Sequence, residues 1–499
     1  MAKDLRTFLS DAKAAGMLHT IDAEVDTQRN VGVLCDESDK GLLFKNIKGY
    51  EGWSVAANLV DNRDMEKVVF GVKDRTDVVR AMAAAMDRGP SPHVYDDKPP
   101  CQEVVWEGED ADLRRLPMVR HSELDGGPYM GNAIGIVNDP ETGHHNTTWP
   151  RLMGGDAKNA PFLIFSPHVG QIAGKYAKMG KPMPMALCIG NHPGVDVAAS
   201  ISVHHPHCGE LDFASAILGE QMKFAKTPLG IDVPANSEIV IEGETILNHV
   251  ADEGPFGNYL GTYCSGPLSR DGVQKAPVFK VKRITTRKNP IYRHLQSTVF
   301  TEHQRLCMLP MEGVLFNALK EMGVDVHDVY IPSWGGCSAT IIQMTPRGPG
   351  EAQDVLLKAA MWENTTLSFM SQLCVTVNKD VNIYDPRDVF WALTIRANYT
   401  ENLHVIPGTR SSPLMPSAKK VPGVPYRRSG KALIDATVLP AKDETEWWEI
   451  NRAWPMGKGK YSITDFVKEG GSAKIMKRLV QHAEAIEMKP GGRVPEIPA

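Results

Sequence analysis

Residues 249–263 read HVADEGPFGNYLGTY, and they place an acid, Glu253, directly before a sharp turn. Proline fixes φ and glycine tolerates positive φ, so Gly254-Pro255 and Gly257 predict a stiff loop that holds this acid near apolar side chains such as Phe256 and Tyr259. The stretch has two interpretations. It is either a functional site around one carboxylate or an ordinary exposed acid beside a β-turn.

The composition is that of an ordinary globular protein. The 499 residues include 55 Lys and Arg against 60 Asp and Glu, which gives a formal charge of −5, and no long run of one sign is present. This balance argues against a nucleic-acid groove and against a polybasic membrane patch, so we expect a small-molecule partner. The length predicts about three domains.

The cysteines and the apolar runs bear on the compartment. The eight cysteines lie far apart and form no C-x-x-C pair, so neither a disulfide framework nor a cysteine zinc site is predicted. The N-terminus has no signal-peptide pattern, and the sequence lacks the apolar run of about 18 residues that a membrane helix needs. We expect a cytoplasmic protein with reduced thiols and no membrane association.

Upstream of the quoted stretch, residues 1–112 have the pattern of a small α/β domain. Apolar residues at helical spacing predict a helix from Leu5 to Ala12, and helical periodicity returns between Met65 and Met86. Short strands are predicted at 42–44 and 53–60. A cluster of prolines then marks a boundary before residue 113.

Residues 113–304 contain many short β-like runs separated by Gly, Pro, Asn and Asp, a pattern typical of a barrel or sandwich. Helices are predicted at 168–179 and 211–218. The expected strands include 133–137, 162–165, 185–189, 238–242 and 278–284. We therefore expect a barrel-like central domain.

Residues 305–450 return to an α/β texture and predict a third domain. Helices are expected at 306–322, 351–362 and 389–393, and strands at 326–331 and 372–377. The last segment, 451–499, contains an amphipathic helix at 475–488. A helix so placed often docks on a neighbouring subunit.

The chemistry-bearing residues of the central domain form a mixed polar set. No phosphate loop, no dinucleotide fingerprint and no G-x-S-x-G motif is present. Asn146, His168 and Glu210 offer an amide oxygen, an imidazole and a carboxylate, a set that suits Mg²⁺ or Mn²⁺. Arg151 is either a clamp for a substrate carboxylate or a surface arginine. Taken singly, His168 and Glu210 are also explained as residues of a helix N-terminus.

A second group, His204, His205 and His207, has a different interpretation. Three close histidines suggest zinc, but they lack the i, i+4 helical spacing of a zinc-hydrolase motif, and Pro206 interrupts them. We favour solvated loop histidines, and a metal-dependent hydrolase remains the rival hypothesis.

Several segments together resemble the UbiD family of non-oxidative (de)carboxylases, which use prenylated flavin mononucleotide. The resemblance covers nearly the whole chain. It rests on Leu43-Phe44-Lys45-Asn46-Ile47-Lys48-Gly49-Tyr50, Asn146-x-x-x-x-Arg151, Pro167-His168-x-x-Gln171-Ile172-Ala173, Glu210-x-Asp212-Phe213, Glu253-Gly254-Pro255-Phe256-Gly257 and Ser429-Gly430-Lys431-Ala432.

The resemblance implies an α/β multi-domain fold. Its parts are an N-terminal α/β domain, a central split β-barrel that binds the flavin, and a C-terminal α/β domain used in oligomerisation. It further implies that Asn146, His168 and Glu210 hold Mn²⁺, or Mg²⁺ or Fe²⁺, at the flavin phosphate, with K⁺ nearby. The implied cofactor-binding residues are Asn146, Thr148, Trp149, Pro150, Arg151, Pro167, His168, Glu210 and Lys431.

The implied catalytic residues are Arg151, Glu253 and the residue at position 258. The family usually has a glutamate where this chain has Asn258, and asparagine cannot supply a proton at neutral pH. Either Glu253 acts alone with water, or another group such as His294, Glu302 or His303 takes over, or the activity is altered or lost.

The resemblance implies reversible decarboxylation of an aromatic or conjugated carboxylic acid, free or as an aryl-CoA thioester, with CO₂ as the second product. A flavin prenyltransferase would supply the cofactor, and the chain would form a homo-oligomer, a dimer or a hexamer. The remaining rival is a non-catalytic flavin-binding subunit of a carboxylase complex.

Overall fold

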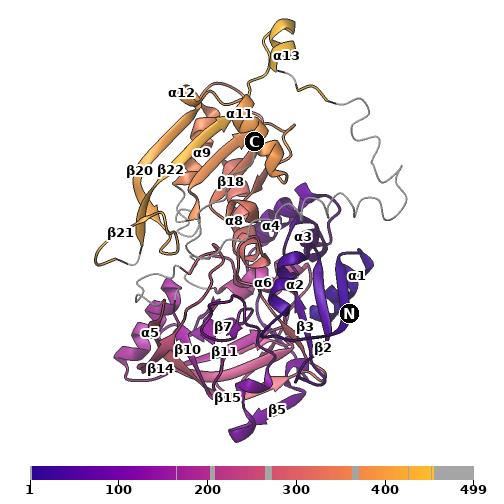
Figure 1. Ribbon diagram of the computed structural model, residues 1–499, viewed down its shortest axis with the longest axis vertical. Helices are drawn as coiled ribbons and strands as arrows, with labels where there is room; N and C mark the ends of the chain where they lie inside the picture. Colours follow the sequence, from indigo (N-terminus) through magenta and orange to yellow (C-terminus); the bar gives the residue numbers. More distant parts are fainter. Residues whose placement is uncertain are drawn as a thin grey trace, which may run out of the picture. The chain divides into compact units, whose positions relative to one another are not determined.

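The structure is a computed structural model that describes residues 3–164, 166–202, 208–263, 272–361, 370–424, 426–450 and 452–454. The chain divides into two compact units, Met1–Pro440 and Ala441–Ala499. Helix α13 (Glu444–Ile450) belongs to the second unit, and all other elements named below belong to the first (Figure 1). The helix predicted at 475–488 lies outside the described residues. Within those residues, no helix has both the length and the apolar character to cross a membrane.

An α/β region with the sheet order β1-β2-β3-β16 forms the N-terminal part of the first unit. The predicted first helix is present: Leu5, Phe8 and Ala12 are buried, and Asp4 caps the helix by accepting the Thr7 N–H at 2.8 Å. The elements of the region are α1 (Leu5–Ala14), β1 (Leu18–Val25), α2 (Val31–Glu37), β2 (Gly41–Ile47), β3 (Ser54–Ala57), α3 (Arg63–Phe70), α4 (Arg75–Arg88) and β16 (Ile291–Arg293).

The periodic segment between Met65 and Met86 forms two helices. Gly71 adopts a φ of 66° and donates its N–H to carbonyls in the last turn of α3. Glycine takes this left-handed conformation without a Cβ clash, so it ends the helix, and α4 begins at Arg75. The hydrophobic periodicity does not predict this break between α3 and α4, because apolar residues continue through it.

Strand β16 returns to the first sheet from far along the chain. It pairs in parallel with β3, with Ile291 opposite Ser54 and Arg293 opposite Ala56. The sequence assigned this sheet to residues 1–112, but its fourth strand comes from residues 291–293. The N-terminal sheet is therefore discontinuous in sequence.

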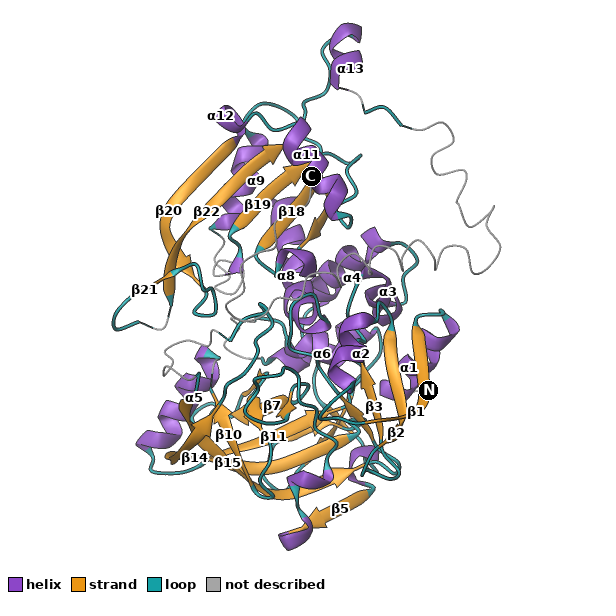
Figure 2. Cartoon of the chain, in the orientation of Figure 1, coloured by secondary structure: helices purple, strands orange, loops and turns teal. Residues whose placement is uncertain are grey.

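The middle part of the chain forms a strongly curled sheet, which lies at the lower end of the first unit in the view of Figure 2. As far as the chain is described, its strand order is β6-β9-β10-β15-β14-β11-β7-β8, with β5 paired to β15. The five strand predictions between 133 and 284 are confirmed as β7, β10, β11, β14 and β15, and the helix predictions as α5 and η4-α7. The elements are β5 (Val104–Glu107), β6 (Tyr129–Met130), β7 (Ile134–Asn138), β8 (His145–Thr148), β9 (Arg151–Met153), β10 (Asn159–Leu163), α5 (Pro167–Lys178), β11 (Met183–Ile189), α6 (Pro193–Ala199), η4 (Glu210–Phe213), α7 (Ala214–Leu218), β14 (Ile239–Glu253) and β15 (Gln274–Thr286).

The curled sheet has a core on each face because strand side chains alternate. In β11, Ala186 and Cys188 pack with residues of α6 and α7, whereas Leu187 and Ile189 pack in a second core with residues of α5. A small sheet, β13-β12-β4, lies alongside. The short elements of this part are β4 (Val94–Tyr95), η1 (Pro100–Gln102), η2 (Gly108–Asp110), η3 (Leu113–Arg115), β12 (Lys223–Lys226) and β13 (Asp232–Pro234).

Strand β14 is longer than predicted and carries Glu253 as its last residue. It pairs antiparallel with β15 over the whole length, with irregular registers after Glu242 and after Ile246, and it places Glu253 opposite Gln274. The expectation that Glu253 lies within a loop is therefore wrong. The loop begins at Gly254, because the β14–β15 ladder continues through the polar residues that the sequence suggested as its end.

The C-terminal sheet has the order β17-β18-β19-β22-β20, with β21 paired to β22. Ile342 packs with residues of α8 and α9, whereas Ile341 packs with Val389 of α11, so helices cover both faces. All five predicted elements are confirmed, as α8, β17, α9, β19 and α11. The elements are α8 (Glu302–Glu321), β17 (Val326–Tyr330), η5 (Ser333–Gly335), β18 (Ala339–Met344), α9 (Glu351–Ala360), β19 (Leu373–Val377), α11 (Pro386–Ile395), α12 (Tyr399–Asn402), β20 (Leu403–Ser411), β21 (Lys419–Lys420) and β22 (Arg427–Ala436).

A buried cluster of four charged residues joins the N-terminal region to α8. Arg305 donates to Glu312 at 2.7 Å and to Glu66 at 2.7 Å, and Arg63 donates to the same two acids at 2.8 Å each. Glu312 also accepts the backbone N–H of Ile331 at 2.7 Å. All four side chains are almost completely buried. The cluster thus links α3, α8 and the end of β17.

Candidate active site

Glu253 has no exposed surface, and both of its carboxylate oxygens accept hydrogen bonds. Arg151 donates its Nε to Oε1 at 2.6 Å and its Nη2 to Oε2, which makes a two-point clamp. The Tyr129 hydroxyl donates to Oε1 at 3.0 Å, and Gln274 donates its Nε2 to Oε2 at 3.0 Å. These four donors offset the large cost of burying a charged carboxylate.

Aromatic rings complete the surroundings of this pair. The Phe256 ring lies 4.7 Å from the Arg151 guanidinium carbon and 4.5 Å from the Tyr129 ring. Burial raises the pKa of Tyr129 well above its ordinary value, and the Glu253 charge adds to this effect, so the hydroxyl keeps its proton. Tyr259, expected beside the acid, packs instead on the C-terminal core.

The turn after Glu253 needs glycine, as the sequence predicted. Gly254 has a φ of 100°, and a Cβ at this position would lie 2.6 Å from the Gly272 carbonyl oxygen. A second loop braces the turn: Asp125 accepts the Gly257 N–H at 2.7 Å, and Gly126 donates to the Pro255 carbonyl at 2.9 Å. This bracing positions the end of β14 and therefore the Glu253 carboxylate.

Asn146 and Arg151 lie on the consecutive strands β8 and β9. The Asn146 amide donates to Glu210 Oε1 at 2.8 Å, and the Thr147 N–H donates to Oε2 at 2.9 Å. Within the described part of the chain, Asn146 Oδ1 is buried and has no hydrogen-bond partner. Burial raises the pKa of Glu210 to about 7, against the opposing effect of the Thr147 hydrogen bond.

These features fit a hard divalent cation. A buried amide oxygen without a partner, next to a buried carboxyl group, is a donor set that Mn²⁺ or Mg²⁺ can use. His168, the third predicted ligand, is the second residue of α5, and this helix packs beside β8. The structure brings Asn146 and Glu210 into direct contact and places His168 on a neighbouring element.

The other predicted cofactor residues occupy the same strand region, except Pro167 and Lys431. Thr148 and Pro150 pack over Gly135, and Trp149 donates its indole N–H to Ser200 at 3.0 Å. Pro167 is exposed at the first position of α5. Lys431 lies on β22 in the C-terminal sheet, where it is buried and donates to the Ser371 carbonyl.

Asn258 forms hydrogen bonds with Leu260 and Thr262, which follow it in the same turn. Its Oδ1 accepts the Leu260 N–H at 2.8 Å, its Nδ2 donates to Thr262 Oγ1 at 3.2 Å, and its backbone N–H donates to the Thr262 carbonyl at 2.9 Å. The side chain is buried. These contacts give asparagine a local role at the position where a second carboxylate was expected.

Replacing Asn258 tests this role. Asn258→Leu removes the hydrogen bonds to Leu260 and to Thr262 Oγ1, and we expect it to lower the free energy of unfolding by about 1–2 kcal/mol in urea denaturation. Asn258→Asp keeps the acceptor for Leu260 and serves as the matched control with a smaller loss. A leucine variant of normal stability that has lost turnover would instead assign Asn258 to the chemistry.

The alternative proton donors have other surroundings. Glu302 accepts the N–H groups of Asn58, Leu59 and Val60 and an Arg293 hydrogen bond, so it anchors the N-terminal sheet. This result speaks against Glu302 as the missing acid. Burial lowers the pKa of His294 and of His303 to about 4 each, so both imidazoles are neutral at pH 7. His204, His205 and His207 of the hydrolase hypothesis lie outside the described residues.

The sequence did not reveal Tyr129, Gln274 or Asp125 as parts of the site. Gln274 reaches Glu253 through strand register, and Tyr129 reaches it across the fold, so neither contact leaves a local pattern. The same holds for Asp125, because its hydrogen bond with the Gly257 N–H joins two residues that are far apart in the sequence. The length of β14 could have revealed Gln274, because the pairing of β14 with β15 determines which residue lies opposite Glu253.

Comparison with known proteins identifies the class. Family models of 3-octaprenyl-4-hydroxybenzoate carboxy-lyase match in order: its N-terminal domain at residues 9–86, its Rift-related domain at 93–299 and its C-terminal domain at 305–436. The anhydromevalonate phosphate decarboxylase of Methanosarcina mazei is 30% identical over 88% of this chain and 98% of its own length. The phenolic acid decarboxylase of Streptomyces sp. (strain D7) is 28% identical over 88% of this chain and 93% of its own.

A solved structure agrees with these matches. The UbiD-class enzyme HmfF from Pelotomaculum thermopropionicum, in complex with FMN, has a TM-score of 0.82 and 29% identity, and the match covers 93% of this chain and 100% of that chain. The three-part α/β fold around a curled sheet is thus that of a carboxy-lyase, and the chain is an enzyme of this class. More narrowly, it belongs to the UbiD family.

Proposed function

We propose that this enzyme catalyses the reversible, non-oxidative decarboxylation of an aromatic or conjugated carboxylic acid, with prenylated FMN and a divalent metal. The observation that carries the proposal is the buried Arg151–Glu253 pair, whose Arg151 begins β9, the strand that follows β8 with Asn146 of the Asn146–Glu210 pair. One pair suits proton transfer and carboxylate binding, and the other suits a cation that neutralises a phosphate.

The protein side of the chemistry follows from exposure and hydrogen bonding. Glu253 is fully buried, whereas 12% of the Arg151 side chain is exposed, so substrate would approach from the arginine side. Within the described residues, Arg151 Nε and Nη2 hold Glu253, which leaves Nη1 for a substrate oxygen. Glu253 would carry the proton that replaces CO₂ on the product carbon, with Tyr129 and Gln274 orienting its carboxyl group.

The cofactor proposal rests on the relatives and on the donor set. FMN is bound in the HmfF structure, and prenylated FMN in an evolved dimeric form of the same enzyme. When bound, the modified flavin supplies the electron sink that the carbon losing CO₂ needs. Asn146, His168 and Glu210 would hold Mn²⁺, Mg²⁺ or Fe²⁺ at its phosphate, with K⁺ nearby and Lys431 contributing from the C-terminal domain.

The name of one relative, phenolic acid decarboxylase, supports an aromatic acid as the substrate, which would be free or a CoA thioester. We further propose a cytoplasmic homo-oligomer, a dimer or hexamer, supplied by a flavin prenyltransferase. We also propose that the domains end at residues 112, 304 and 450.

The test is to express the chain with and without a flavin prenyltransferase. We expect the co-expressed protein to carry a cofactor with the absorbance and mass of prenylated FMN and to release CO₂ from members of a panel of aromatic acids and their CoA thioesters. Turnover that does not depend on the prenyltransferase would contradict the proposal.

A further inference from the structure

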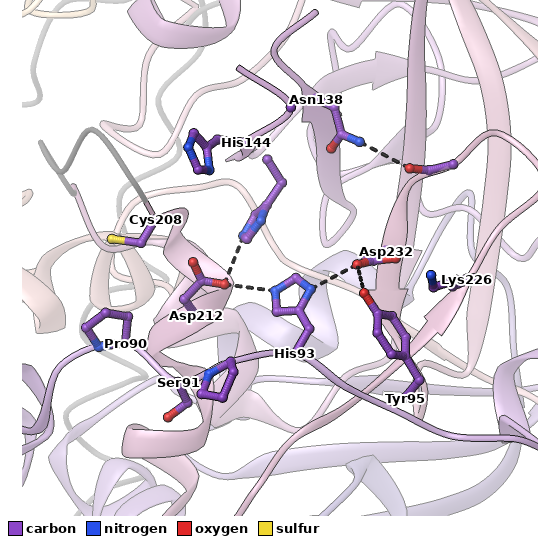
Figure 3. A pocket seen from close by; sticks show the side chains of 14 residues that line it. Pro90, Ser91, His93, Tyr95, Asn138, His144, Cys208, Asp212, Lys226 and Asp232 are labelled. Carbon is purple, nitrogen blue, oxygen red and sulfur yellow. Dashed lines mark hydrogen bonds and ion pairs between the residues drawn. The ribbon is translucent and has the colours of Figure 1, made fainter. Parts of the chain in front are cut away.

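A cavity of about 610 Å³ opens in the central region, and neither Arg151 nor Glu253 is among the residues that line it. Figure 3 shows His93, one of its lining residues, between the carboxylates of Asp212 and Asp232. His93 Nε2 lies 2.8 Å from Asp212 Oδ1, and His93 Nδ1 lies 3.0 Å from Asp232 Oδ2. His145 Nε2 lies 3.8 Å from the same Asp212 oxygen. Two imidazoles and one carboxylate therefore converge on one point.

We propose that His93, His145 and Asp212 form a second metal site, for a divalent transition metal of the zinc type, separate from the Asn146–Glu210 pair. Two imidazoles and one carboxylate, with a further position for water, are a ligand set that Zn²⁺ uses in open sites. Donor atoms of the three side chains all lie within 4.8 Å of one another. The separations of 2.8 and 3.8 Å lie on either side of the roughly 3.3 Å expected between tetrahedral ligands at zinc bond lengths.

The strand geometry separates the two sites. His145 and Asn146 are adjacent in β8, so their side chains point to opposite faces. Asn146 pairs with Glu210, and His145 approaches Asp212, two residues further along η4. The backbone of β8 therefore lies between the donors of the proposed flavin-phosphate metal and the donors that face the cavity.

Neighbouring side chains and backbone groups orient His93 and Asp212, as residues around a metal site commonly orient its ligands. Asp232 accepts from His93 Nδ1, which directs Nε2 to the metal position, and the Tyr95 hydroxyl fixes Asp232 at 2.7 Å. The Gly209 N–H donates to the second oxygen of Asp212 at 2.9 Å. The His93 ring is stacked on Phe224 at 3.6 Å.

A purely structural network would explain His93 but not His145. A protonated His93 between Asp212 and Asp232 is a complete pair of charged hydrogen bonds. His145 Nε2, by contrast, is buried and has no hydrogen-bond partner within the described chain, although it points toward Asp212. Buried polar atoms of this kind are rare unless an ion or water satisfies them. A metal ion in place of the His93 proton would satisfy all three donors.

The experiment measures zinc bound per chain after equilibrium dialysis of chelator-treated protein. It uses the Glu210→Gln background, which removes the flavin-phosphate metal, so this test is independent of turnover. We expect one bound Zn²⁺ and expect His145→Ala or Asp212→Asn to abolish it. Asp232→Asn should weaken binding about 10–100-fold, as loss of an outer-shell partner does.

His144→Ala is the matched control, since His144 lines the same cavity next to His145, and it should bind zinc normally. His145→Gln and a thermal melt of every variant separate loss of ligand from loss of fold. Zinc-edge X-ray absorption should report nitrogen and oxygen ligands that include two imidazoles. Undiminished zinc in the His145→Ala and Asp212→Asn proteins, or loss only when His204, His205 and His207 are replaced, would overturn the proposal.

Discussion

Glu253→Gln is expected to lower the decarboxylation rate by about 10²–10⁴-fold, the usual contribution of a positioned acid–base group. The amide keeps the size of the side chain but cannot shuttle a proton. It also turns an N–H₂ toward Arg151 or Gln274, where the carboxylate accepts hydrogen bonds. The rate is measured as CO₂ release by enzyme loaded with prenylated flavin.

Asp252→Asn is the matched control for this prediction. Asp252 is the preceding residue of β14, but its side chain is about 65% exposed and pairs with Lys275 at the surface. The control should therefore retain normal turnover. Flavin absorbance shows whether Glu253→Gln still binds cofactor. A Glu253→Gln enzyme that works at the normal rate would assign the proton transfer to another group.

Glu312→Gln is expected to have the largest effect on stability, about 3–5 kcal/mol, because it breaks a buried ion-pair network from one side. Glu312 accepts from Arg63, from Arg305 and from the Ile331 N–H. After the change, Glu66 is the one acid within the described chain that still contacts both buried guanidinium groups, and Arg63 keeps a longer contact of 3.8 Å with Asp328. The free energy of unfolding is measured in urea.

Glu244→Gln provides the comparison with an ordinary surface pair. Glu244 and Lys282 form an ion pair whose side chains are 22% and 47% exposed, and its loss should change stability by about 1 kcal/mol or less. Equal effects of the two substitutions would show that the buried cluster is not a strong link between α3 and α8.

The elements that the sequence predicted correctly have a strong local signal. The burial of Leu5, Phe8 and Ala12 follows from helical spacing, and the strands of the curled sheet follow from short apolar runs between turn residues. The resemblance implied that Arg151 and Glu253 both belong to the site, and the structure pairs them. The hydrogen-bond distance between Arg151 and Glu253 and the burial of Glu253 come from the structure alone.

The parts that the sequence did not predict depend on long-range register. Gln274 donates to Glu253 because β15 pairs with β14 in one register and no other. Likewise, nothing local distinguishes Glu302, which anchors backbone N–H groups, from an acid that serves catalysis. His93 meets Asp212 and Asp232 only after three distant segments have packed together.

Strand β16 has a consequence for how the protein is made. The edge of β3 that accepts Ile291–Arg293 is synthesised long before its partner. At about 5–20 residues per second, a ribosome needs roughly 10–50 s to deliver the missing strand. During that interval the nascent chain presents an open sheet edge, which is a template for wrong pairing. The first sheet is thus a late product of translation, although most of its residues emerge first.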